Sequence, residues 1–454
     1  MKEIHIKIID KMKSLLFLYF CVAMAFSAMA SSVSDTYVIP NPQQMVCGDG
    51  HFVLRAQASF SCNLTGTDKD DFVSYVSNSP LSLIYKKKGK ADITFKLVSS
   101  ENAKMKEESY RLKVTKKGIQ AEATSTSGLF YAFQSIVQLA RESGNATYQL
   151  PEVTIEDAPR FSYRGMHLDV SRHFYTKEFV KKQIDALARY KLNRFHWHLT
   201  DGAGWRIEIK KYPELTRETA YRPFPDWKSW WNGGRTYCRQ DAPGASGGYY
   251  TQEDVKEIVE YARQRHITVI PEIEMPAHSE EVLAALPQLA CGGDLKSGGE
   301  FCPGKELTYE FLTNVLKEVM ELFPSEYIHI GGDEASTNHW KQCPDCQALM
   351  KAEGMKEEGE LQEYLVSRIE KFLKENGRKM IGWDEILTGE LDETSAVTVW
   401  RGEDKGAESV KRGLRTSCHR EHIAILTATR MHRVRSQRPS EDTSRWKRFI
   451  HTNR

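Results

Sequence analysis

Residues 251–273, TQEDVKEIVEYARQRHITVIPEI, decide the fold class of this chain. The stretch opens with a helix-capping signature and predicts a helix that runs to residue 265. The apolar run at 267–273 then predicts a buried strand. Because strand-like and helix-like segments alternate in this way along most of the chain, the sequence predicts a parallel sheet covered by helices.

Charged and aromatic residues collect just after each predicted strand, where a (β/α)8 barrel places its active site. The predicted strands are residues 163–170, 193–199, 267–273, 327–330, 379–383 and 396–400. The predicted helices between them are residues 176–190, 251–265, 306–323 and 361–376. We therefore expect an α/β fold with a (β/α)8 TIM-type barrel that is incomplete, at about six β/α units. A doubly wound open sheet is the alternative, but no Gly-rich phosphate loop supports it.

A small α+β domain is predicted before the barrel, over residues 31–157. Alternating stretches at 91–97 and 110–114 predict half-buried strands, and residues 128–141 have helical spacing. No catalytic cluster lies in this region, so we expect it to support a catalytic barrel at residues 158–416.

The composition changes in residues 417–454, which hold eight Arg and one Lys against three acids. A basic arm is one interpretation. We prefer an aberrant tail that results from loss of the natural reading frame, because the barrel is otherwise two units short. An open barrel of that kind would expose two strand edges.

The N-terminus predicts a signal peptide over residues 1–30. Lys11 and Lys13 precede an apolar run at 15–26, and Ala-Met-Ala at 28–30 forms a cleavage site. The run is too short to cross a membrane, so we expect no transmembrane segment. The protein should be exported, to the periplasm, the cell surface or the medium.

The charge balance points to no polyanionic partner. The net charge is +2 at 27% charged residues, an ordinary globular composition that gives no reason to expect binding of nucleic acid. The oligomeric state is not determined by the sequence.

Cysteines in an exported protein can form disulfides. The expected pairs are Cys47 with Cys62, Cys291 with Cys302, and Cys343 with Cys346. The last pair is a CPDC motif that could also be half of a zinc site. We do not expect zinc here, because the chain has no second CxxC.

Two adjacent acids end the fourth strand, in the stretch YIHIGGDEAS at 327–336. Gly331 and Gly332 interrupt the strand, so that Asp333 and Glu334 can approach one ligand from different sides. The structural alternative is that Asp333 caps a following helix.

Histidines suggest a second kind of site. His196 and His198 alternate in FHWHLTD and should point to one face. With His278 they could hold the ion of a metal-dependent barrel hydrolase. We place this hypothesis second, because no complete ligand set occurs in the expected order.

Six motifs occur in order: RGMHLDVSRHF, FHWHLTDGAGW, PEIEMPAH, HIGGDE, GWDE and VWRG. Together they resemble the family 20 glycoside hydrolases, the β-N-acetylhexosaminidases, over residues 38–415. The resemblance implies exo-hydrolysis of terminal β-linked GlcNAc or GalNAc from an oligosaccharide or glycoconjugate, without a cofactor or a metal. It does not separate the two sugars. The implied mechanism retains configuration and is assisted by the substrate's own 2-acetamido group.

The resemblance also assigns roles. Glu334 matches the family's acid/base, and Asp333 matches the residue that holds the acetamide N–H and offsets the developing positive charge. Arg164 matches an arginine that binds sugar hydroxyls. Asp201 and His278 match a pair linked to the acid/base. The aromatic walls of the pocket match Trp383 and Trp400, and Glu385 beside Trp383 is a further possible polar contact.

The C-terminal part departs from the family pattern. Relatives bring a tyrosine for the acetamide oxygen and further acids on their last two strands, whereas this chain has no tyrosine after Tyr364. We therefore expect a chain with little or no activity, and a non-catalytic sugar-binding chain is the third hypothesis.

Overall fold

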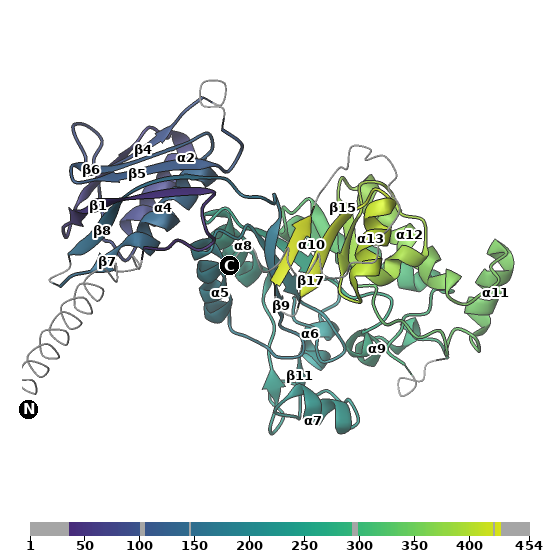
Figure 1. Ribbon diagram of the computed structural model, residues 1–454. Helices are drawn as coiled ribbons and strands as arrows, with labels where there is room; N and C mark the ends of the chain where they lie inside the picture. Colours follow the sequence, from purple (N-terminus) through teal and green to yellow (C-terminus); the bar gives the residue numbers. More distant parts are fainter. Residues whose placement is uncertain (1–35, 100–104, 145–146, 293–297, 421–422, 428–454) are drawn as a thin grey trace, which may run out of the picture.

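The computed structural model describes residues 36–99, 105–144, 147–292, 298–420 and 423–427, which form a small sheet domain and a barrel (Figure 1). The expected signal peptide and the part of the expected tail from residue 428 onward lie outside these residues.

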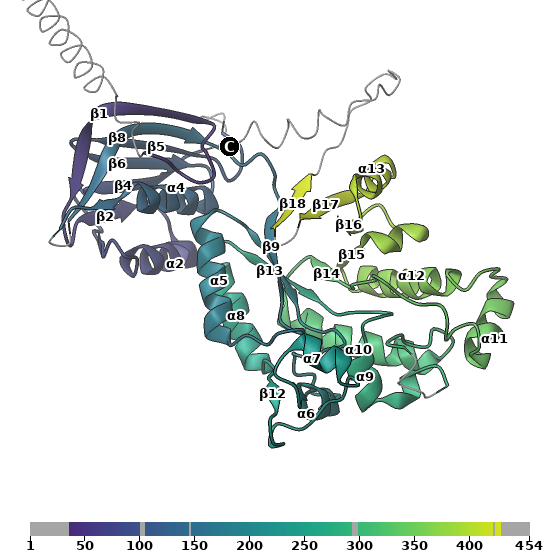
Figure 2. The same ribbon diagram turned by 60° about the horizontal axis from the view of Figure 1, so that its bottom comes forward.

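Over the described residues, the small domain is an eight-stranded sheet with two helices. Its strand order is β1-β8-β5-β6-β4-β2-β3, and β7 pairs with β8. The strands are β1 (Gln44–Leu54), β2 (Ser59–Cys62), β3 (Ile84–Tyr85), β4 (Ile93–Leu97), β5 (Tyr110–Thr115), β6 (Gly118–Ala123), β7 (Arg141–Glu142) and β8 (Tyr148–Asp157). Helices α2 (Gly66–Ser77) and α4 (Thr126–Leu139) lie along one face of this sheet (Figure 2). Buried and exposed residues alternate in β4 and β5, as a sheet with one solvated face requires.

This sheet excludes one expected disulfide. Cys47 lies on β1 and Cys62 on β2, and strands β8, β5, β6 and β4 lie between them. The expected pair is therefore wrong. The other four cysteines of the expected pairs are not two separate pairs either, because their sulfur atoms gather in one cluster.

Eight strands close into the barrel in the order β10-β13-β14-β15-β16-β17-β18-β9. They are β9 (Arg164–Asp169), β10 (Arg194–His198), β13 (Thr268–Glu272), β14 (Tyr327–His329), β15 (Lys379–Trp383), β16 (Ala396–Val399), β17 (Arg415–Arg420) and β18 (Ile423–Thr427). The helices on the outside are α5 (Lys177–Arg189), α8 (Gln252–Arg263), α10 (Glu306–Leu322), α12 (Glu360–Glu375) and α13 (Glu403–Lys411) (Figure 1).

Shorter elements lie in the loops that follow the strands. They are α6 (Glu214–Thr219), β11 (Tyr221–Arg222), α7 (Trp227–Asn232), β12 (Ser246–Gly247), α9 (Glu280–Ala285), η1 (Pro287–Leu289), α11 (Pro344–Glu353) and η3 (Asp384–Thr388). The long loop after β10 carries α6, β11, α7 and β12 and projects from the barrel at the bottom of Figure 1.

The six predicted strands all form, but the expected end of the barrel at residue 416 is wrong. Strand β17 pairs in parallel with β16, and β18 returns antiparallel to it. Strand β18 then pairs antiparallel with β9, so this ring has no open edge. The apolar run at 423–426 therefore belongs to a closing strand, and the expectation of an open barrel is wrong. The closure does not change the lack of a tyrosine after Tyr364, on which the expectation of low activity was based.

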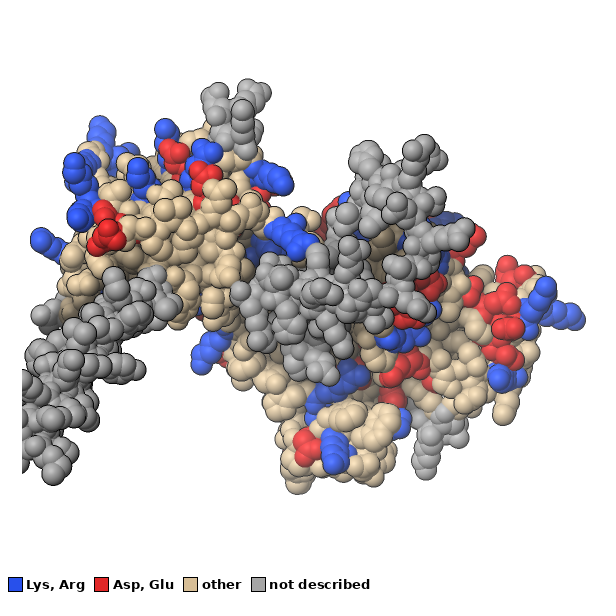
Figure 3. All heavy atoms as spheres, viewed as in Figure 1, with Lys and Arg blue, Asp and Glu red and all other residues tan. Residues whose placement is uncertain are grey.

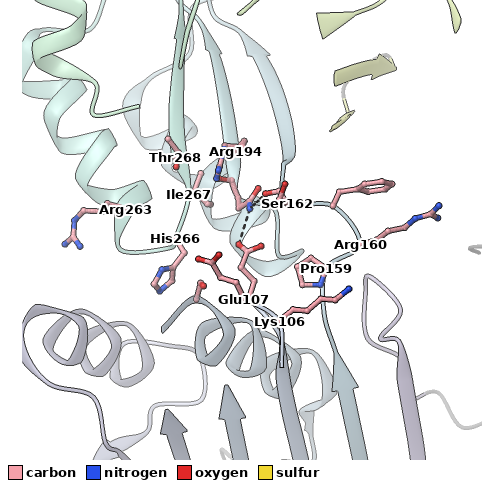
Figure 4. Close-up of a pocket in the computed structure, with 14 residues that line it drawn as sticks. Lys106, Glu107, Pro159, Arg160, Ser162, Arg194, Arg263, His266, Ile267 and Thr268 are labelled. Atoms are coloured by element: carbon pink, nitrogen blue, oxygen red, sulfur yellow. Dashed lines mark hydrogen bonds between the residues drawn. The ribbon is translucent and has the colours of Figure 1, made fainter. Parts of the chain in front are cut away.

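The small domain contacts the barrel at the amino ends of the strands. Gln138 of α4 donates a hydrogen bond to the carbonyl of Arg189, which ends α5, at 2.7 Å. A cavity of about 680 Å³ lies at this junction and reaches the first residues of two strands, Arg194 and Thr268 (Figure 4). It lies at the opposite end of the strands from the acids of interest.

Among the residues described, no helix combines the length and the apolar character needed to cross a bilayer. Basic and acidic side chains are interspersed over both the small domain and the barrel on the face seen in Figure 3.

Candidate active site

The adjacent acids lie in a short irregular segment at the carboxyl end of β14. Gly331 and Gly332 have φ values of 69° and 96°, which glycine adopts without strain. A Cβ atom on Gly331 would lie 1.7 Å from Oε2 of Glu274, so this position requires glycine. The helix-cap alternative for Asp333 is wrong, because the next helix along the chain, α11, begins only at Pro344.

His278 brings the two acids together from the neighbouring loop. Its Nε2 atom lies 3.2 Å from Oδ2 of Asp333 and 3.4 Å from Oε2 of Glu334. The imidazole therefore stands between the group expected to move the proton and the group expected to hold the acetamide. Both His278 and Glu334 have positive φ values, 51° and 52°, a strained backbone conformation that is common at functional sites.

Asp201 completes this arrangement behind His278. Its Oδ2 atom lies 3.8 Å from Nδ1 of His278 and 2.7 Å from Nη2 of Arg172. Arg172 also binds Asp169 at 3.0 Å. His278 thus lies between Asp201 and Glu334, and the part that Asp201 and His278 play in catalysis stays a prediction.

Arg164 does not reach this cluster, and the expectation that it binds the sugar is wrong. It is the first residue of β9, at the amino end of the barrel. Its Nη1 atom forms an ion pair with Glu108 of the small domain at 3.0 Å, and its Nη2 atom donates to the hydroxyl of Tyr131 at 3.2 Å. Arg164 therefore joins the two domains.

Arg172 is the arginine that sequence reasoning missed. It follows the carboxyl end of β9, which ends at Asp169, and its side chain is 32% exposed. The signal was present in the quoted motif RGMHLDVSRHF, because only its second arginine follows the strand. A guanidinium at that end can donate to sugar hydroxyls.

The electrostatics of the cluster favour a charged pair. Burial lowers the pKa of His278, but Asp333 and Asp201 outweigh it and raise that pKa to about 10. Burial raises the pKa of Asp333, but the hydrogen bond from His278 outweighs it and leaves the pKa below its usual value. Asp333 is thus ionised opposite an imidazolium at neutral pH. Burial raises the pKa of Asp201 to about 7, against the opposing effects of Arg172 and His278.

A second acid–histidine group fills the barrel beneath the site. The carboxylate of Glu272 lies 2.7 Å from Nε2 of His196 and 3.6 Å from Nδ1 of His198. The two histidines therefore face the same side of β10, as predicted. Burial raises the pKa of Glu272, but His198, His329 and His196 outweigh it and hold that pKa well below the usual value.

The metal-dependent alternative is not supported by this arrangement. Histidine and carboxylate atoms do gather closely enough to ligate an ion, but in three separate groups. His196, His198 and His278 each belong to a different group. The three histidines of that hypothesis therefore do not form one site among the residues described.

The two predicted aromatic walls differ in exposure. Trp383 is 7% exposed, and its Nε1 atom donates to Oε1 of Glu272 at 2.7 Å. Trp400 is 44% exposed, and its Nε1 atom donates to Oε2 of Glu385 at 3.2 Å. Burial raises the pKa of Glu385 to about 7. Trp400 therefore exposes its ring to solvent, whereas Trp383 is part of the barrel interior.

Residues 161–453 match the sequence model of the family described as glycosyl hydrolase family 20, catalytic domain, and residues 35–158 match its domain 2. The chain belongs to glycosyl hydrolase family 20. The match to the catalytic domain continues well beyond residue 415, where the resemblance in the sequence was expected to end.

Individual relatives agree with this family. The chain is 46% identical over 316 residues to a β-hexosaminidase of Porphyromonas gingivalis, which covers 66% of this chain and 39% of the relative. It is 37% identical over 400 residues to a β-hexosaminidase of Vibrio furnissii, and this match covers 85% of this chain and 63% of the relative. The family 20 exo-β-N-acetylglucosaminidase of Vibrio harveyi, solved with N-acetylglucosamine, superposes with a TM-score of 0.75 at 32% sequence identity. The superposition covers 84% of this chain and 60% of the Vibrio harveyi chain. The chain thus spans between two fifths and two thirds of the length of these relatives.

Proposed function

We propose that this chain is an exo-acting β-N-acetylhexosaminidase that removes terminal β-linked GlcNAc or GalNAc by a retaining, substrate-assisted mechanism. The proposal is supported by family membership, by the β-hexosaminidase names of the relatives and by the N-acetylglucosamine bound to the Vibrio harveyi enzyme. The single observation that carries the mechanism is the cluster of Asp333, His278 and Glu334.

Asp333 is suited to the acetamide. Its Oδ2 atom faces His278, whereas its Oδ1 atom is buried and has no hydrogen-bond partner among the described residues. A buried acceptor without a partner costs free energy, about 1–3 kcal/mol, which a substrate N–H would recover. The ionised carboxylate would also stabilise the positive charge that forms when the acetamide oxygen attacks the anomeric carbon.

Glu334 is suited to proton transfer. Its side chain is 58% exposed, so it can reach the glycosidic oxygen of a bound sugar. It would protonate that oxygen in the first step and deprotonate the attacking water in the second. Arg172, in place of Arg164, would hold hydroxyl groups of the terminal sugar, and Trp400 would stack on a sugar ring.

Turnover of an aryl β-N-acetylglucosaminide by the purified full chain tests the activity. A thiazoline mimic of the cyclised acetamide intermediate should inhibit competitively. Trapping a covalent glycosyl-enzyme would contradict substrate assistance. A bound metal ion that is lost together with activity in His198→Gln would favour the metal-dependent alternative.

We also propose that the protein is exported, on the basis of the signal sequence at residues 1–30. N-terminal sequencing of the protein from the producing cells should find a start after the Ala-Met-Ala site. An intact N-terminus on the mature protein would contradict export through this signal.

A further inference from the structure

Four buried cysteines lie together beside the candidate active site. Their side chains are between 0% and 9% exposed, and the residues are Cys291, Cys302, Cys343 and Cys346. All four sulfur atoms lie within 4.8 Å of one another. The separations are 3.6 Å for Cys291–Cys346 and 3.5 Å for both Cys302–Cys343 and Cys302–Cys346.

These separations fit a tetrahedral metal site better than disulfides. A disulfide requires sulfur atoms about 2.05 Å apart, and one sulfur can bond only one other. Here Cys302 approaches two partners equally closely. Four thiolates at about 2.3 Å from a central Zn²⁺ in a tetrahedron lie about 3.8 Å from one another, close to the separations observed.

We propose that the four cysteines hold a structural Zn²⁺ ion. Four sulfur ligands leave no open position, which is the arrangement of a structural rather than a catalytic zinc site. The surroundings are closed as well, because Trp340, Met350 and Leu361 are buried against the cluster. The indole of Trp340 donates to the carbonyl of Phe301 at 3.0 Å, which fixes the backbone next to Cys302.

The position of this site gives it a role in ordering the active site. Cys291 and Cys302 lie in the loop after β13, which also carries His278, and the other two cysteines lie after β14, at the start of α11. Asp333 and Glu334 precede them on the same segment. The ion would therefore cross-link the two loops whose side chains meet at His278.

The sequence excluded zinc because the CPDC motif has no second CxxC. The second pair of ligands is instead separated by ten residues, in CGGDLKSGGEFC at 291–302. The fold brings this longer spacing to the CPDC motif, so the lack of a second CxxC does not argue against zinc.

Metal analysis of the full chain, purified without chelators or reductant, tests the proposal. We expect close to one equivalent of zinc per chain, its loss in Cys343→Ser, and its retention in Cys47→Ser, where an exposed cysteine outside the cluster is changed. Exchange with Co²⁺ should give the intense thiolate charge-transfer and d–d bands of a tetrahedral site even if Cys343→Ser fails to fold.

Two results would contradict the proposed zinc site. Peptide mapping that finds these cysteines in disulfides, in protein that contains no zinc and takes up no Co²⁺, would overturn the proposal. Iron in place of zinc would overturn the choice of metal. None of these readouts depends on glycosidase activity. The zinc proposal can therefore be disproved while the proposed function stands, and the proposed function can be disproved while the zinc proposal stands.

Discussion

The Nε2 atom of His278 lies 3.2 Å from Oδ2 of Asp333, and this contact joins the loop after β13 to the segment after β14. It holds a positive charge next to the group that is expected to steer the substrate's acetamide. Because the side chains are only 18% and 15% exposed, water screens the contact weakly.

Asp333→Asn should lower kcat by roughly 10²–10³-fold, because an amide cannot offset the charge on the cyclising acetamide. The thiazoline mimic should lose affinity by a comparable factor. Both quantities come from steady-state kinetics and inhibition assays. Asp70→Asn, on an exposed site of α2, is the matched control. Undiminished thiazoline binding by Asp333→Asn would argue against its contact with the acetamide.

Glu334→Gln should lower kcat/KM by roughly 10²–10⁴-fold on substrates with a poor leaving group, which needs protonation. The loss should be smaller for an activated aryl leaving group. A series of aryl glycosides that differ in leaving-group pKa measures this dependence, with Glu375→Gln on an exposed site of α12 as control. Equal losses across the series would exclude Glu334 as the acid.

His278 should make stability depend on pH. Its pKa rises from 6.5 to about 10 on folding, so the native state binds the proton more tightly than the unfolded chain. The stabilisation is therefore complete below pH 6.5 and is lost as the pH rises through 10. We expect the difference in unfolding free energy between wild type and His278→Gln to shrink by roughly 2–4 kcal/mol over this range.

Denaturant titrations of both proteins at several pH values measure that difference. A constant difference from pH 6 to pH 10.5 would show that the native state does not hold the extra proton. The Asp333→Asn background should reduce the effect, because the largest favourable interaction of the imidazolium is with Asp333.

Arg164 and Arg172 should separate stability from activity. Arg164→Lys breaks the fork that binds Glu108 and Tyr131 and should cost about 1–3 kcal/mol of unfolding free energy with kcat/KM nearly unchanged. Arg172→Lys should lower kcat/KM by at least tenfold, since it binds Asp201 in the site. Thermal unfolding and steady-state kinetics of both variants measure these effects. A large loss of kcat/KM in Arg164→Lys with little loss in Arg172→Lys would indicate that Arg164 binds the sugar after all.

Trp400→Ala should raise KM by roughly 3- to 10-fold with a small effect on stability, because its exposed ring can stack on a sugar. Trp383→Phe should instead destabilise the protein by about 1–3 kcal/mol, since it removes the indole N–H that Glu272 accepts. Both KM and the unfolding free energy are measured for both variants, so that each variant serves as the control for the other. An unchanged KM in Trp400→Ala would show that Trp400 does not contact the substrate.

The regular part of the fold could be predicted from local sequence patterns. The six strands and four helices predicted for the barrel lie within a few residues of the observed elements, because each has a strand-like apolar or alternating pattern or helical spacing. Strand β17 was missed because its sequence, RTSCHR, is polar and is followed by another strand and not by a helix. Its pairing with β16 is a tertiary effect that no local pattern carries.

The grouping of Asp201, His278, Asp333 and Glu334 could be predicted because each follows the end of a strand, whereas their roles in catalysis stay predictions. Arg164 was misassigned because the motif contains two arginines, of which only Arg172 follows the predicted strand at 163–170. The cysteine cluster was missed for a different reason. Its ligands come from two segments that are more than 40 residues apart, as in Cys302 and Cys343, and only the packing of two loops brings them together.

The return of β18 to β9 has a consequence for how the protein is made. Strand β9 begins at Arg164, whereas its partner begins at Ile423, so almost the whole barrel is synthesised before one side of β9 acquires its neighbour. Until then, β9 presents unpaired backbone groups to any chain it meets. A nascent chain therefore exposes this edge of β9 until the last strand of the ring has been synthesised.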